Sequence, residues 1–174
     1  MEQNFTIIDH IDHLKAYKSF IGKSVSSISH CQYFYNNEPD CEADGDLEIK
    51  FDDESVLTLS IKGDGESMIA RAESLNIPDS FTIENNDTCS WKRILLNCEP
   101  EWENIIDLNL VDIESMVDHW VDQKQKVLSG CRFTFSNGYF IVFCNVGDNA
   151  RFTINDLSLV EKLEGVETKF ISIT

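Results

Sequence analysis

The sequence has few basic residues and no long apolar run, and each absence excludes a class of function. Lys and Arg together number 14 against 31 Asp and Glu residues, so the 174-residue chain carries a formal net charge of −17. Binding to nucleic acid is disfavoured, because neutralising phosphates requires clustered Lys and Arg side chains. No stretch approaches the roughly 18 consecutive apolar residues of a membrane span, so we expect no membrane partner.

A secretory signal is also missing, since Met1-Glu2-Gln3-Asn4 does not begin the basic and apolar regions of one. We therefore expect a cytoplasmic protein whose cysteines are thiols. Their spacing contains no Cys-x-x-Cys, which argues against a zinc knuckle and a thioredoxin-type redox pair. Free cysteine commonly serves as a small buried hydrophobic residue, and this is the role expected for Cys31, Cys41, Cys89, Cys98, Cys131 and Cys144.

Motifs that carry chemistry are equally scarce. The sequence contains no phosphate-binding glycine loop, no nucleophile elbow and no zinc-protease helix. The acidic run from Asp40 to Glu48 has oxygen side chains at alternate positions and a glycine at the sixth, as a calcium loop does, but its twelfth position is Phe51 instead of a bidentate Glu. We therefore expect a binding protein without cofactor or metal site, not an enzyme.

An internal repeat is the most informative pattern that is present. Residues 47–60 align without a gap on residues 131–144. In both segments alternating apolar residues lead into a polar turn and out into a second apolar run, which predicts a β-hairpin with one buried face. Phe51 and Phe135 precede the two turns, and Asn137-Gly138 in the second turn is a dipeptide favoured in type I′ turns.

The similarity continues on both sides of the hairpins. Downstream, Met68 and Ala70 align with Phe152 and Ile154, which predicts a third strand in each copy. Upstream, Val25-Ser26-Ser27-Ile28 resembles Ile113-Glu114-Ser115-Met116 if the first copy has a loop four residues longer, the acidic stretch 40–46. Each copy would then be a small β-meander.

These patterns predict an α+β fold that is mainly antiparallel sheet, with two duplicated β-meander units and a few packing helices. The repeats span about residues 21–80 and 108–155 of a single compact domain, residues 1–174, because no Pro/Gly/Ser linker separates them. Segment 111–123 fits a helix or a strand by its apolar spacing, and the repeat favours a strand. Further helices are expected over 8–21, from Pro100 through Trp102, and over 156–165, with strands over 90–97 and 166–173.

Acidic and aromatic residues occur together in two places, the stretch from Tyr33 to Glu48 and the stretch from Trp91 to Glu103. Interfaces favour buried aromatic anchors ringed by charge. An acidic surface also attracts and steers a basic protein partner. The opposing interpretation is that the aromatics belong to the core and the carboxylates only keep the protein soluble. The candidate partner-binding residues are Tyr35, Glu38, Asp40, Glu42, Asp44, Asp46, Glu99, Glu101, Trp102 and Glu103.

The paired hairpins Phe51-Asp52-Asp53-Glu54 and Phe135-Ser136-Asn137-Gly138, in a small acidic α+β chain, give the sequence a resemblance. In this organisation it resembles the bacterial immunity proteins of polymorphic and contact-dependent toxin systems. The resemblance implies binding to a cognate toxin domain, often a basic nuclease, but it transfers no functional residue. Two alternatives stay open, an acidic adaptor or regulatory module without a toxin partner and, less favoured, an enzyme with an unrecognised site.

We expect a monomer or weak dimer with all six cysteines reduced. Thiol titration of the denatured protein without reductant should then detect six thiols per chain. Detection of two or none would contradict the cytoplasmic assignment.

Overall fold

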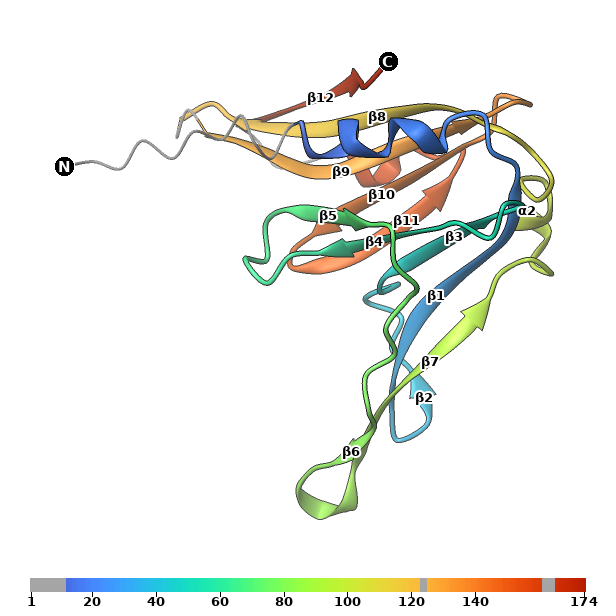
Figure 1. The fold of residues 1–174 in the computed structure, drawn as a ribbon. Coiled ribbons are helices and arrows are strands. Elements are labelled where there is room, and N and C mark those ends of the chain that lie inside the picture. Colours follow the sequence, from blue (N-terminus) through green and yellow to red (C-terminus); the bar gives the residue numbers. More distant parts are fainter. Residues whose placement is uncertain (1–11, 123–124, 161–164) are drawn as a thin grey trace.

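The computed structural model describes residues 12–122, 125–160 and 165–174. Within these ranges two antiparallel sheets pack against each other (Figure 1). The first sheet contains, in spatial order, β5 (Met68–Arg71), β4 (Val56–Ile61), β3 (Leu47–Phe51), β1 (Val25–Tyr35), β7 (Thr88–Leu95) and β6 (Phe81–Thr82), and β2 (Glu38–Pro39) also pairs with β1. The second contains β11 (Asn149–Ile154), β10 (Phe140–Val146), β9 (Gln125–Phe135), β8 (Leu110–Trp120) and β12 (Val166–Ser172).

Helical segments are short. They are the 3₁₀ helices η1 (His13–Phe20), η2 (Glu84–Asn86) and η3 (Ser158–Val160) and the α-helix α2 (Pro100–Glu103). A mainly antiparallel fold with a few helices agrees with the expected class. Segment 111–123 is a strand through Trp120, the end of β8, and a turn follows at 121–122. The parts of the expected helices at 8–11 and 161–164 lie outside the described residues. No helix in the described ranges has the length and apolar character needed to cross a membrane.

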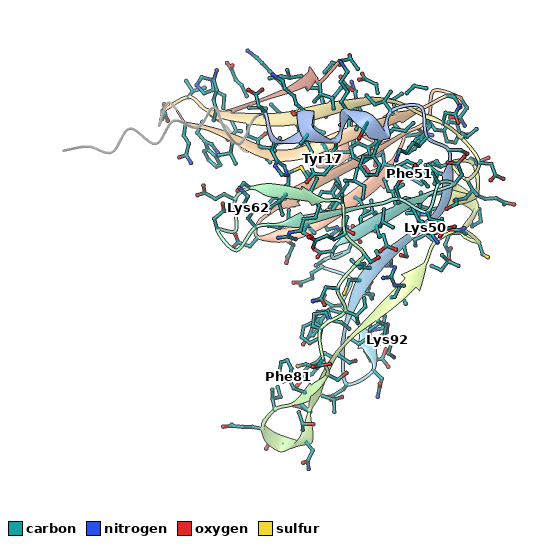
Figure 2. All side chains as sticks on the ribbon, in the orientation of Figure 1. Tyr17, Lys50, Phe51, Lys62, Phe81 and Lys92 are labelled. Carbon is teal, nitrogen blue, oxygen red and sulfur yellow. The ribbon has the colours of Figure 1, made fainter. Side chains whose placement is uncertain are left out.

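The core lies between the inner faces of the two sheets. Phe51 and Leu59 from the first sheet belong to the same buried cluster as Phe133, Phe135 and Phe143 from the second. All five side chains are at most 1% exposed. The helix η1 adds Leu14 and Phe20 to this cluster, and the Phe20 ring lies 5.2 Å from that of Phe51. Figure 2 places Tyr17 and Phe51 in this part of the molecule.

The two predicted hairpins are present and have the same hydrogen bonds. The Phe51 N–H donates to Ser55 O and the Phe135 N–H to Tyr139 O, at 2.9 and 2.8 Å. The residues just before these acceptors, Glu54 and Gly138, have positive φ values of 65° and 86°. The expectation of a type I′ turn at Asn137-Gly138 is wrong, because that turn needs positive φ at both central residues and Asn137 does not have it. Two consecutive positive φ values do occur at Gly147 and Asp148, between β10 and β11.

Strand register corrects the upstream alignment of the two units. Val25 lies opposite Phe51, and Leu110 lies opposite Phe135, with a register shift one residue later in both pairs of strands. Val25 therefore corresponds to Leu110 and not to Ile113. The stretch from Val25 to Phe51 is then one residue longer than the stretch from Leu110 to Phe135, whereas the sequence alignment required four extra residues. The acidic stretch of the first unit takes the place of the first half of β9.

The downstream alignment is also shifted. Met68 lies opposite Ile61, whereas Ala150 lies opposite Asn145. Ala150, not Phe152, is thus the counterpart of Met68. The reason is that the segment between Ile61 and Met68 is two residues longer than the segment between Asn145 and Ala150.

Backbone contacts join the two units at the starts of β1 and β8. Ser24 and Asn109 form an antiparallel bridge. Beside it, Val25 N–H donates to Leu108 O and Leu110 N–H donates to Lys23 O, both at 2.9 Å. Each unit thus donates one of two equivalent hydrogen bonds to the other, as the two halves of a two-fold symmetric contact do.

The first sheet continues into an arm made of the distal half of β1 with β7, β6 and β2, which projects from the sandwich (Figure 1). Aromatic rings cover one face of the arm. The ring centroid of Trp91 lies 5.1 Å from that of Tyr33 and 5.8 Å from that of Phe81. Figure 2 shows Phe81 and Lys92 on this arm. Phe81 is 51% exposed, so the arm keeps apolar surface in contact with water.

Replacing Gly138 with Ala should lower the free energy of unfolding by about 1 kcal/mol, since its φ of 86° is unfavourable for a residue with a Cβ atom. The matched control is Gly63→Ala, because Gly63 has no positive φ and a Cβ atom there meets nothing within 4 Å. Urea denaturation of both variants measures the difference. Equal stability of the two variants would contradict the turn geometry.

Candidate functional site

A hollow of about 470 Å³ lies where β1 and β11 meet the segment that leads into α2. Its lining combines carboxylates with aromatic rings: His30, Asp44, Leu96, Glu99, Pro100, Glu101, Trp102 and Phe152. We call this site the acidic hollow. Four of these residues, namely Asp44, Glu99, Glu101 and Trp102, are among those that the sequence pointed to.

Three aromatic rings form the inner part of the acidic hollow. Phe152 on β11 stands between the other two, with its ring centroid 5.4 Å from that of His30 and 5.4 Å from that of Trp102, both edge-on. His30 and Trp102 are 8% and 7% exposed. The packing is therefore fixed before any partner arrives, and most of the Trp102 surface is already used in the core.

Asp44 anchors residues 40–46, which we call the acidic loop, to the second sheet. Its Oδ2 accepts hydrogen bonds from Arg151 Nε and from the Phe152 N–H, both at 3.0 Å. Its backbone N–H donates to Ala150 O at 2.9 Å, and its own carbonyl oxygen lies 2.6 Å from His30 Nδ1. A carbonyl oxygen only accepts, so Nδ1 carries the hydrogen in this contact.

The remaining carboxylates of the hollow belong to its rim. Glu99 and Glu101 are exposed, as is Glu103 one turn further along α2. The structure shows no ion pair for these three in the described part of the chain. Pro100 at the first turn of α2 fixes the chain direction there, so the three acidic side chains stand on one short, ordered segment.

The other predicted residues lie elsewhere. Tyr35 and Glu38 are on the arm, where the Tyr35 hydroxyl donates to Asp87 Oδ2 at 2.5 Å. Asp40 and Glu42 begin the acidic loop, with Asp40 Oδ1 accepting from the Glu42 N–H at 2.8 Å. Asp46 is half-buried at the far end of that loop, and burial raises the pKa of its carboxyl although Ser60 and Arg71 act in the opposite direction.

Sequence reasoning missed His30, Leu96 and Phe152 as members of the site. Each belongs to, or directly follows, a strand that was expected to serve only the fold, and their positions across two sheets follow from packing. In the described residues no group of three or more His, Cys, Asp and Glu side chains is arranged to hold a metal ion. Comparison with protein-family models, with curated proteins and with solved structures finds no match to the chain.

Replacing Asp44 with Ala should free the acidic loop and lower the free energy of unfolding by about 1 to 2 kcal/mol, since the Phe152 N–H and the Arg151 side chain lose their acceptor. Hydrogen exchange of residues 40–46 measures the loosening. Glu42→Ala is the control, because the structure shows only main-chain contacts for Glu42. If exchange rates in the loop rise equally in both variants, Asp44 is not the anchor.

Proposed function

We propose that this protein is a binding protein, not an enzyme, and that it captures a basic protein partner at the acidic hollow. Following the resemblance of its sequence, we assign it the role of an immunity protein that neutralises a cognate toxin domain. The observation that supports the site is that the acidic loop and the Glu99–Glu103 segment, far apart in sequence, meet at one depression.

The chemistry of the acidic hollow suits a Lys or Arg side chain of a partner. Glu99 and Glu101 at the rim attract a cation, and charge-assisted hydrogen bonds to carboxylates are among the strongest polar contacts. The partly buried ring of Phe152 offers a cation an additional aromatic surface. Exposed carboxylates also accelerate encounter with a basic protein, in a salt-dependent way.

We further propose that the two sheets are duplicates of one unit, spanning residues 13–97 and 100–174 of a single body. Several equivalent contacts support this. Asp52 N–H donates to Ser24 O and Ser136 N–H to Asn109 O, both at 2.9 Å. Near the end of each unit, Leu96 N–H donates to Ile28 O and Ile173 N–H to Ile113 O, at 2.9 and 3.1 Å.

The proposed duplication accounts for the position of the acidic hollow. In the first unit η1 covers the edge of β5, because the Tyr17 hydroxyl donates to Ala70 O at 2.5 Å and His13 also contacts Ala70. At the equivalent place in the second unit, Trp102 packs on Phe152 of β11. The four-residue helix α2 is half as long as η1, so space is left beside Trp102.

Neutralisation of charge at the rim should slow capture of the partner. The first partner to test is the product of the reading frame directly upstream, with relief of growth arrest on co-expression as the biological readout. Stopped-flow association of the two purified proteins should slow about tenfold or more between roughly 0.05 and 0.5 M salt. The triple variant Glu99→Gln, Glu101→Gln, Glu103→Gln should associate several-fold more slowly at low salt.

A matched control separates the acidic hollow from overall charge. Asp52→Asn, Asp79→Asn, Glu84→Gln removes the same number of charges from exposed residues elsewhere. It should retain most of the association rate. Equal slowing by both triple variants would contradict the hollow as the binding site. A salt-insensitive rate, or the absence of both binding and growth rescue, would contradict the proposed function.

A further inference from the structure

A second cavity, of about 620 Å³, lies where the β4–β5 and β10–β11 turns approach β8 and β12. It shares no residue with the acidic hollow. Trp120, Val127, Leu159 and Val166 supply apolar walls. A cavity of this size with apolar walls is typical of sites for small molecules.

Comparison of the two sheets suggests why this space is open. On the first sheet Tyr33 of β1 lies opposite Trp91 of β7, with the rings 5.1 Å apart. The corresponding pair on the second sheet is Asp118 of β8 and Thr168 of β12, where the Thr168 hydroxyl donates to Asp118 Oδ1 at 2.7 Å. Two aromatic rings are thus replaced by two small polar side chains, so room for a ring is available beside Asp118.

The charged side chains among the described lining residues are carboxylates. Glu66, Asp118 and Asp148 bring three carboxylates to its lining, and the lining residues that the structure describes include no Lys, Arg or His. Asp118 is only 4% exposed. Asn145 donates through Nδ2 to Gly65 O, while its Oδ1 is buried without a hydrogen-bond partner in the described part of the chain. A buried acceptor without a partner costs free energy, which a donor that reached it would recover.

We propose that this cavity binds a small organic cation that carries a primary ammonium group on an aromatic or branched apolar body. An ammonium group has three donors and no acceptor, which matches a lining of carboxylates and an amide oxygen. The apolar body would take the ring-sized space between Trp120, Val127 and Leu159. This proposal is independent of the proposed protein partner, because the two sites have no residue in common.

The test is a ¹H–¹⁵N NMR titration of the full chain with phenethylamine. We expect the indole N–H of Trp120 and the side-chain amide of Asn145 to shift in a saturable manner. The neutral analogue 2-phenylethanol and the anionic analogue 3-phenylpropionate should bind at least about tenfold more weakly, because they lack the charge-assisted contact.

Variants locate the binding. Asp118→Asn removes the charge and keeps an oxygen for Thr168, and it should weaken phenethylamine binding about tenfold or more. Val127→Phe, which fills the cavity, should abolish binding and serves as a second variant if the first does not fold. Asp79→Asn and the Glu99, Glu101, Glu103 triple variant should bind as the unmodified protein does.

Three results would overturn the proposal. One is the absence of shifts at Trp120 and Asn145 up to about 10 mM phenethylamine. Another is equal affinity for 2-phenylethanol. The third is unchanged affinity in the folded Asp118→Asn or Val127→Phe variant.

Discussion

Each of the two sheets has one apolar face, and the fold removes these faces from water by packing them on each other. Phe51 and Leu59 on one side and Phe133, Phe135 and Phe143 on the other belong to one buried cluster. A sheet with one apolar face must bury that face against another element. Burial of a large aromatic or aliphatic side chain contributes roughly 1.5 to 3 kcal/mol, so the shared core is what holds the two units together.

The junction at Ser24 and Asn109 fixes how the two units face each other. Two equivalent hydrogen bonds, Val25 to Leu108 and Leu110 to Lys23, connect the starts of β1 and β8. Because each unit contributes the same backbone groups, the contact has the character of a two-fold interface within one chain. Under the proposed duplication, residues with the same place in the two units can be compared directly.

Under the proposed duplication, both candidate binding sites lie where the two units differ. The acidic hollow lies beside the short helix α2, whereas the longer η1 covers the equivalent place in the first unit. The second cavity lies beside Asp118 and Thr168, where the first unit has the paired rings of Tyr33 and Trp91. The shared backbone geometry supplies the scaffold, and the side chains that differ supply the sites.

The sequence by itself determined the hairpins at 47–60 and 131–144 and the short helix at Pro100, because alternation, turn residues and proline act locally. The strand at β8 followed only from the repeat, since its apolar spacing also fits a helix. The tertiary structure alone decided the strand registers, which differ from the sequence alignment of the two units by three residues at Val25 and by two at Met68. It also brought His30 and Phe152 to Trp102. Loop length and cross-sheet packing set these features, and both depend on contacts between residues far apart in the chain, which periodicity does not report.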